Sequence, residues 1–352
     1  MLIIVKLVAA AVFIASIVVV IVSLIKKNKE GAMSTTLITA GLGIINGSFG
    51  TFSDKFFAAL IQQQSETNYV QLAVGCAIFL GGLYSSRYVR NKLYILNING
   101  YRDYRIEDHQ NDLGLSPFEF KENTIDFIRL FKRGPTQQNF DDIYEEIKQK
   151  IDAFKRESVD VKRAYTGIAP IPFILLAGRH FGGDGINEHF ELRKGNNNTY
   201  YRLKSNKKWK FFATKYPALH LTMPNLNQTV TEIVLTVGLT SKITASQAEQ
   251  FSCPIVDLSL DNPMDNAILF KEQLSEYNNQ IYKLLIQLSS DYSNLQKIHL
   301  LYSGQSCLIF ELGKVISDTR MAEIISYQFE RQQTPNYPWG ITLNGTQTGT
   351  LT

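Results

Sequence analysis

The stretch Ala164-Tyr165-Thr166-Gly167-Ile168-Ala169-Pro170 is followed by Phe173-Ile174-Leu175-Leu176-Ala177-Gly178-Arg179. About 135 residues later, the chain repeats this pattern as His299-Leu300-Leu301-Tyr302-Ser303-Gly304-Gln305 and Leu308-Ile309-Phe310-Glu311-Leu312-Gly313-Lys314. Each copy has an apolar run typical of a strand, a tight polar turn and a helix that ends at Gly-Arg or Gly-Lys. A duplicated strand–turn–helix unit predicts a pseudo-two-fold body with a ligand cleft between its halves.

Strands are predicted on both sides of the repeated unit. Leu93 to Ile98 is expected to open the first half, and Glu232 to Val237 to open the second. Later strand signals fall at His189–Leu192, Tyr200–Leu203, Ile325–Phe329 and Gly340–Leu343. Strands that alternate with helices indicate an α/β fold with a substantially parallel sheet in each half. Two unrelated α/β units, rather than a true duplication, are the alternative interpretation.

Each half also contains one predicted amphipathic helix. Asn139 is the expected N-cap of the first of them. The apolar positions at helical spacing are Ile143, Tyr144, Ile147, Ile151 and Phe154 in the first half, and Ile281, Tyr282, Leu285 and Leu288 in the second.

The first 92 residues are predicted to be a transmembrane region. The 24 residues from Leu2 to Ile25 contain one charge and can cross a hydrocarbon layer of roughly 30 Å. A signal peptide is the alternative, but the run is long and Lys26-Lys27-Asn28-Lys29 resembles a stop-transfer flank. A second span is expected at 67–86, where Arg87 and the following basic residues indicate a cytoplasmic end.

The stretch 31–53 is also free of charge, but it is rich in glycine, serine and threonine. We interpret it as a loop or re-entrant segment, which gives two spans. A third span is the alternative, because it would place both basic flanks on the same side of the membrane.

The composition favours anionic partners and a reducing compartment. The net charge is +4 with a pI near 8.7, and only 19% of the residues are charged. The three cysteines are odd in number and far apart, so a disulfide framework is not expected.

Ligands of open α/β sheets collect beyond the carboxyl ends of the strands. Four such ends are predicted, and they are small and polar. The candidate ligand-binding residues at these ends are Tyr101, Arg102, Thr166, Pro170, Thr240, Ser241, Lys242, Ser303, Gly304, Gln305 and Ser306.

The turn Ser303-Gly304-Gln305-Ser306 is the strongest of these candidates. Gly304 would allow close approach of the backbone, and Ser303, Gln305 and Ser306 can donate to phosphate or base edges. The helix that follows has free N–H groups that suit an anion. A plain helix N-cap is the alternative, because Ser and Gly are favoured there in any case.

Several segments resemble a known family. Ile298-His299-Leu300 through Gly313, then Tyr327-Gln328-Phe329-Glu330 and Tyr337-Pro338-Trp339-Gly340-Ile341, resemble the closing half of a SAVED domain. Ile233-Val234-Leu235-Thr236-Val237-Gly238-Leu239-Thr240 is similar to the strand that opens that half. With a membrane region ahead of it, the chain resembles the transmembrane SAVED effectors of bacterial CBASS anti-phage systems.

This resemblance implies a SAVED sensor at 93–352, made of two fused CARF-like (Rossmann-like) halves at about 93–224 and 225–352. It implies an activating ligand that is a cyclic oligonucleotide, such as a cyclic trinucleotide made by a CD-NTase, with no further cofactor and no DNA partner. It also implies self-association into oligomers, disruption of the lipid bilayer and abortive infection. The implied location is the bacterial inner membrane, multi-pass, with the sensor in the cytoplasm. The family often has Ser where Thr240 stands, and a threonine hydroxyl can donate in the same way.

No motif predicts an enzyme or a metal site. The five histidines lack a His-x-x-x-His partner, and the cysteines lack a Cys-x-x-Cys pair. His299 lies in an apolar strand and is expected to be a core residue with hydrogen-bond partners. The sequence therefore favours a membrane effector that works by binding. A membrane-tethered sensor that regulates a separate effector, such as a protease, is the alternative.

Overall fold

The computed structural model describes residues 29–48, 69–101, 119–159, 161–193, 199–206 and 215–352. The chain divides into two compact units, which we treat separately. The first comprises residues 1–93, 115–120 and 160–162, and its described part is mainly two helices. The second comprises residues 94–114, 121–159 and 163–352 and holds both β-sheets.

The first unit contains a tightly packed helix pair, α2 (Lys29–Ser48) and α4 (Tyr69–Asn91). The contact is close because glycines face the partner helix: a Cβ on Gly41 would overlap the backbone of Phe79, and one on Gly82 would overlap Ile38. A hydrogen bond of 2.8 Å also joins the Ser34 and Ser85 hydroxyls. Small residues and interhelical hydroxyl bonds are the usual means of holding helices together in an apolar setting.

The stretch 31–53 was expected to be a loop or re-entrant segment, and this was wrong for the part that the structure describes. That part is a helix up to Ser48, because its glycines are compensated by close packing on α4. Of the predicted spans, 67–86 corresponds to Tyr69–Tyr88 of α4, the one helix among the described residues that is long and apolar enough to cross a membrane. The predicted span at 2–25 lies outside the described residues.

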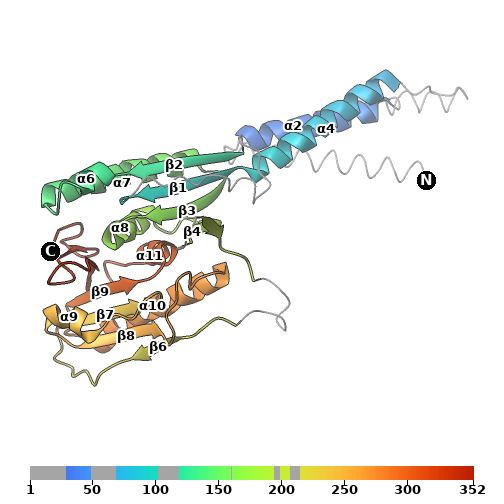
Figure 1. The fold of residues 1–352 in the computed structure, drawn as a ribbon. Coiled ribbons are helices and arrows are strands. Elements are labelled where there is room, and N and C mark those ends of the chain that lie inside the picture. The colour runs from blue at the N-terminus through green and yellow to red at the C-terminus, as the bar shows by residue number, and fades with distance from the viewer. Residues whose placement is uncertain (1–28, 49–68, 102–118, 160, 194–198, 207–214) are drawn as a thin grey trace, which may run out of the picture. The chain divides into compact units, whose positions relative to one another are not determined.

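The first sheet has the strand order β2-β1-β3-β4-β5 (Figure 1). β4 runs parallel to β3 and antiparallel to β5. Its strands are β1 (Leu93–Asn99), β2 (Phe120–Asp126), β3 (Lys162–Ile168), β4 (Glu188–Leu192) and β5 (Tyr200–Arg202).

The second sheet has the order β11-β10-β9-β7-β8-β6. β9 lies between β7 and β10 and is parallel to both, whereas the outer strands β11 and β6 are antiparallel to their neighbours. Its strands are β6 (Leu219–Thr222), β7 (Glu232–Gly238), β8 (Ile255–Leu260), β9 (Lys297–Ser303), β10 (Glu323–Gln328) and β11 (Trp339–Thr342).

The two sheets have equivalent topologies. The order β2-β1-β3-β4-β5 corresponds strand for strand to β8-β7-β9-β10-β11, with a final antiparallel strand in each. The repeat in the sequence is therefore a repeat of the fold, as predicted. The second sheet includes β6, so it begins before residue 225, where the second half was expected to start.

The helices pack their apolar positions into a shared core. α7 (Gln137–Glu157) and α10 (Lys271–Asp291) are the predicted amphipathic helices, and α8 (Ile171–Phe181) and α11 (Ser306–Gly313) complete the repeated units. Short helical turns lie at α6 (Ile128–Phe131), α9 (Ala245–Ala248) and η2 (Glu249–Phe251).

Asn139 was expected to cap α7, but the N-cap is Thr136. The Thr136 hydroxyl accepts from the backbone N of Asn139 at 3.3 Å, while the Asn139 amide donates to the carbonyl of Gly134 at 3.0 Å. The helix therefore begins at Gln137, directly after the N-cap residue Thr136. Asn139 lies within the first turn, where its side chain binds the preceding turn and does not cap the helix.

α8 and α11 cross at two glycines that are equivalent in the repeat, Gly178 and Gly313. A Cβ on Gly178 would overlap the carbonyl oxygen of Phe310, three residues before Gly313. A Cβ on Gly313 would overlap the carbonyl of Leu175, three residues before Gly178. This reciprocal contact lies on the pseudo-two-fold axis and lets the two helix backbones touch.

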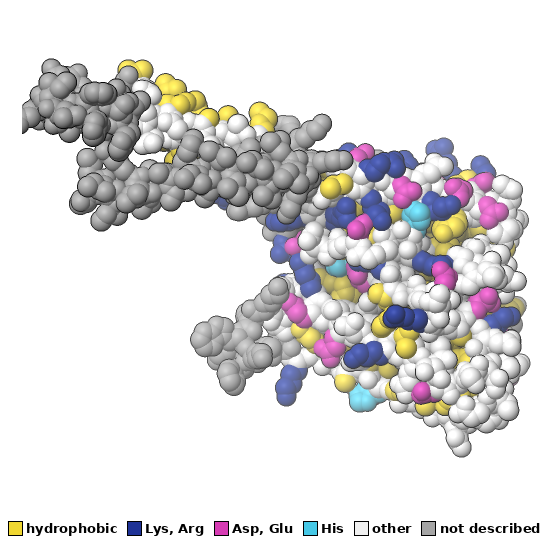
Figure 2. All heavy atoms as spheres, turned by 180° about the vertical axis from the view of Figure 1, so that it is seen from behind, with side chains coloured by type: hydrophobic (Ala, Val, Ile, Leu, Met, Phe, Trp, Pro, Cys, Tyr) yellow, Lys and Arg dark blue, Asp and Glu magenta, His cyan; other side chains and the backbone are white. Residues whose placement is uncertain are grey.

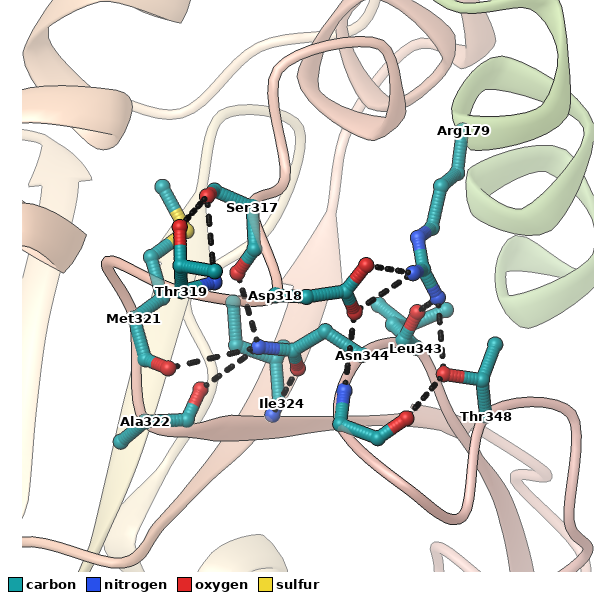
Figure 3. A network of polar contacts seen from close by, with 11 residues as sticks. Arg179, Ser317, Asp318, Thr319, Met321, Ala322, Ile324, Leu343, Asn344 and Thr348 are labelled. Atoms are coloured by element: carbon teal, nitrogen blue, oxygen red, sulfur yellow. Dashed lines mark hydrogen bonds and ion pairs between the residues drawn. The ribbon is translucent and has the colours of Figure 1, made fainter.

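Arg179, the residue after Gly178, ties α8 to the C-terminal segment (Figure 3). Its guanidinium donates to both carboxylate oxygens of Asp318, at 2.6 and 2.8 Å, and to the Thr348 hydroxyl at 2.9 Å, and it also contacts the Leu343 carbonyl. A forked guanidinium suits this set of acceptors. The contact fixes the orientation of the two halves beside the glycine crossing.

Replacement of Gly178 by alanine tests the crossing. In an ordinary helix interior this change stabilises by up to about 1 kcal/mol, through helix propensity. Here the new methyl group overlaps a carbonyl, so we expect a loss of roughly 1–3 kcal/mol in the free energy of unfolding, the usual cost of overpacking. Chemical denaturation measures this difference.

Gly183→Ala is the matched control, because a Cβ at Gly183 would meet no atom within 4 Å. Its stability should stay within a few tenths of a kcal/mol of wild type. A Gly178→Ala protein as stable as this control would show that the close crossing does not form.

Candidate functional site

The predicted strand ends of the first half meet each other. The backbone N–H groups of Gly100 and Tyr101, which follow β1, both donate to the Ile168 carbonyl at the end of β3, at 2.9 and 3.3 Å. Tyr101 is 41% exposed, and its ring lies edge-on to Phe131 at 5.7 Å. Arg102 lies outside the described residues.

The strand ends of the second half meet in the same way. Leu239 and Thr240, which follow β7, donate their backbone N–H groups to the Ser303 carbonyl at 2.7 and 3.1 Å. The side-chain hydroxyls of Thr240 and Ser303 are 3.1 Å apart. Ser241 and Lys242 come next and are exposed. The structure therefore brings these predicted residues together in an accessible turn.

Both halves present their strand ends at one edge of the unit. The backbone N–H of Ile171, just after β3, donates to the Gln328 side chain at the end of β10, at 3.1 Å. The backbone N–H of Cys307, just after β9, donates to Glu191 near the end of β4, at 2.6 Å. Because β4 is parallel to β3 and β10 is parallel to β9, these exchanges align the carboxyl ends of the two sheets. We call this the strand-end edge.

The amino end of α11 was expected to offer free N–H groups to a phosphate, and there the structure differs. The Glu191 carboxylate accepts from both the Cys307 N–H and the Ser306 hydroxyl, the latter at 3.1 Å. Glu191 is 6% exposed, and burial raises the pKa of its carboxyl. An acid from the opposite half thus takes the place that the sequence suggested for a ligand anion.

Gln305 is engaged within the protein. Its side-chain oxygen accepts from the backbone N of Ile268 at 2.5 Å, and its nitrogen donates to the Tyr201 hydroxyl at 2.6 Å and to the Ile268 carbonyl at 3.0 Å. It is buried and joins β5 of the first half to the loop before α10. Its amide therefore positions the turn.

Gly304 has a local role in the same turn. A Cβ there would overlap the Tyr302 hydroxyl, which donates to the carbonyl of Gln305 at 2.7 Å. In the first half, Thr166 is buried in β3 and Pro170 is the buried N-cap residue of α8. These two lie at or beneath the strand-end edge and do not reach its surface.

Sequence reasoning missed Glu191 and Gln328. Both come from strands next to the repeated units and act on the helix of the opposite half. They occupy equivalent places, because Glu191 lies on β4 and Gln328 on β10. The one available signal was a charged residue inside the short apolar strand predicted at His189–Leu192.

A different cavity lies at the opposite edge of the second sheet. Its volume is about 430 Å³, and it is lined by residues 225–227, 229–232 and 251–254, around the amino end of β7. His299 lies close by, with its two ring nitrogens 3.0 Å from the Tyr327 hydroxyl and 3.2 Å from Glu232. Burial lowers the pKa of His299, which has partners on both sides, as predicted for a core residue.

Among the residues that the structure describes, no three His, Cys, Asp or Glu side chains come together as a metal site requires.

More than half of the chain matches one known protein family. A model of the "SMODS-associated and fused to various effectors sensor domain", SAVED, matches residues 142–343, more than half of the sequence. The chain belongs to the SAVED family. The match begins inside α7 and ends after β11, so it spans the glycine crossing and the whole second sheet.

One solved structure has a similar fold. The Cap4 SAVED/CARF-domain receptor of Acinetobacter baumannii, solved with the cyclic trinucleotide 2'3'3'-cAAA, is similar with a TM-score of 0.50 and 14% identity. The alignment covers 87% of this chain and 62% of that chain, so our chain spans less than two thirds of that receptor. The Cap4 SAVED/CARF-domain receptor of Moraxella osloensis has a TM-score of 0.42 and 12% sequence identity to this chain. That alignment covers 82% of this chain and 62% of the Moraxella osloensis chain. A search of curated proteins gave no match.

Replacement of Gln305 by alanine tests the positioning role of its amide. The change leaves the Ile268 backbone groups and the Tyr201 hydroxyl without this partner, so we expect a loss of about 1–3 kcal/mol in unfolding free energy. Chemical denaturation of the variant measures this loss.

Gln287→Ala, at an exposed position of α10, is the control and should change the stability little. If both variants unfold at the same denaturant concentration as wild type, the Gln305 network contributes nothing and its amide is available to a ligand.

Proposed function

We propose that the chain is a sensor for a cyclic oligonucleotide, which binds at the strand-end edge. The observation that carries this proposal is the SAVED match together with a fold whose two halves present their strand ends at one edge. Ligands of open α/β sheets bind at such edges. The second half supplies neighbouring hydroxyls from Thr240 and Ser303, followed by the exposed cation Lys242.

The chemistry of this turn suits a phosphate-bearing ligand of repeated units. Hydroxyls donate to phosphate oxygens or base edges, and a lysine adds a point charge. Duplicated halves can each contact one part of a cyclic ligand. The Acinetobacter baumannii receptor of similar fold was solved with a cyclic trinucleotide. We therefore propose a cyclic trinucleotide, made by a CD-NTase during phage infection, as the activating ligand in a CBASS system.

The described part of the face shown in Figure 2 has no continuous basic patch that would suggest DNA as the ligand. On the face shown in Figure 2, Lys and Arg side chains are interspersed with Asp and Glu. A duplex-binding surface usually carries a continuous basic patch.

The output that we propose is at a membrane. α4 exposes large apolar side chains, among them Val70, Leu80 and Tyr84, and Figure 2 shows hydrophobic side chains along the helix pair. Such a surface suits lipid or another apolar helix. We propose a multi-pass protein of the bacterial inner membrane with the sensor in the cytoplasm. Ligand-driven self-association would then cluster the helices and disrupt the bilayer without a catalytic step, causing abortive infection.

A membrane-tethered sensor that regulates a separate protein, such as a protease, is the second candidate. The observation in its favour is the tight α2–α4 pair, which is held by glycine contacts and by the Ser34–Ser85 hydrogen bond, as suits a membrane anchor. In that case the α2–α4 pair would serve as an anchor.

Thermal unfolding of the detergent-purified full chain tests the sensor proposal. A panel of cyclic di- and trinucleotides should include at least one that raises the melting temperature, because a ligand present at 100 times its Kd adds about 2.7 kcal/mol. Lys242→Ala should reduce this shift, whereas Lys283→Ala, on the exposed side of α10, should not. A panel in which no compound changes the melting temperature would contradict the proposal.

Release of a dye from liposomes separates the two outputs. With the full chain reconstituted, addition of the stabilising nucleotide should cause leakage if the chain itself disrupts the bilayer. An anchor for a separate effector should leave the vesicles intact. Turnover of the nucleotide by the purified chain would point instead to an enzyme.

A further inference from the structure

The reciprocal contacts at the strand-end edge are chemically unequal. At the amino end of α8, the partner from the opposite half is Gln328, a neutral amide that accepts from Ile171 N–H at 3.1 Å. At the amino end of α11, the partner is Glu191, an acid that accepts from Cys307 N–H at 2.6 Å. The topology is the same on both sides, but the donors also differ. The Ser306 hydroxyl and the Cys307 N–H face Glu191, whereas the equivalent residues of α8, Ile171 and Pro172, offer one N–H and no hydroxyl.

Few groups around Glu191 stabilise a negative charge on its carboxylate. The Ser306 hydroxyl and the Cys307 N–H donate to the same oxygen of its carboxylate. The titratable groups around it include Tyr165 on β3, Tyr201 on β5, Tyr302 on β9, and Cys307 and Glu311 on α11. None of these five is a cation.

The cations near this cluster are engaged with other groups. Lys314 pairs with Glu311 at 2.9 Å. Arg193 lies over the Tyr201 ring, with 5.6 Å to the ring centroid. The helix N-terminus is thus the main stabilising partner of the Glu191 carboxylate.

An unused donor lies in the same place. The Tyr165 hydroxyl is buried and lies beside the Ser306 hydroxyl, but among the described residues it makes no hydrogen bond of standard geometry. Burial and the nearby Glu191 charge raise its pKa, so it keeps its proton. The ring is stacked on Phe310 at 4.0 Å, which fixes its direction. The cluster therefore holds one more donor than Glu191 uses, as a site for a larger anion would.

We propose that Glu191 occupies an anion position at the amino end of α11 and thereby sets the charge preference of the strand-end edge. The carboxylate stands where a phosphate or sulfate group would otherwise receive the Ser306, Cys307 and Tyr165 donors. The Glu191 carboxylate then keeps the anionic groups of a ligand away from the amino end of α11, whereas Gln328, on the equivalent strand of the other half, carries no charge. This inference rests on the proposed function where it concerns cyclic oligonucleotides.

Two charge-changing variants with nearly unchanged shape test it. Glu191→Gln keeps the acceptor oxygen for α11 and removes the charge, so anion affinity should rise. Gln328→Glu places a carboxylate at the equivalent position, so anion affinity should fall. We expect changes of about tenfold in each direction, because placing like charges side by side is costly in a buried setting.

The experiment uses the detergent-purified full chain and two probes. Calorimetric titration with 2'3'3'-cAAA gives the nucleotide affinity of wild type and both variants. Thermal unfolding in sulfate, with ionic strength held constant by chloride, gives anion binding that does not depend on the nucleotide. Tighter cAAA binding by Glu191→Gln and weaker binding by Gln328→Glu would support the inference and the proposed function together.

If no variant binds cAAA, but sulfate stabilises Glu191→Gln more than wild type, this nucleotide is not the ligand and the Glu191 inference still holds. Equal or weaker response of Glu191→Gln to both probes would overturn the inference. Should Glu191→Gln fail to fold, Gln328→Glu decides alone: a weaker response supports the inference, and an unchanged one overturns it.

Discussion

The α8–α11 crossing is the contact on which the second unit depends. Gly178 and Gly313 let two helix backbones touch, and each glycine faces a carbonyl of the other helix. No side chain larger than hydrogen fits at either position without a shift. Because the contact is reciprocal, it fixes one half against the other about a pseudo-two-fold axis. The equal strand orders of the two sheets then bring equivalent strand ends to one edge.

At that edge, each half completes the helix of the other. Gln328 and Glu191 cap helices across the axis, so neither helix N-terminus is left to solvent. This exchange makes the edge a joint product of both halves, and a ligand bound there would report on their relative position. A sensor that transmits binding needs such a two-part site, because a ligand shifts only the equilibrium between states that it binds unequally.

The repeat could be predicted because a strand, a turn and a helix each leave a local pattern, and both copies kept the terminal glycine before Arg179 or Lys314. The meeting of Thr240 with Ser303 also followed, since parallel strands end at the same edge. The capping by Glu191 could not be predicted, because it joins residues 116 positions apart on different halves. The helix at Lys29–Ser48 was not predicted, because a glycine-rich sequence favours a loop. Only the structure shows the partner helix α4, against which these glycines pack.

Hydrogen–deuterium exchange of the full chain, with and without 2'3'3'-cAAA, tests the central claim most directly. The claim is that a cyclic oligonucleotide binds at the strand-end edge. It predicts slower exchange at Gly238–Lys242 and Ser303–Ser306, together with the residues after β3 in the other half. Protection confined to residues 225–232 and 251–254, around the cavity at the opposite edge, would contradict it, as would no change anywhere.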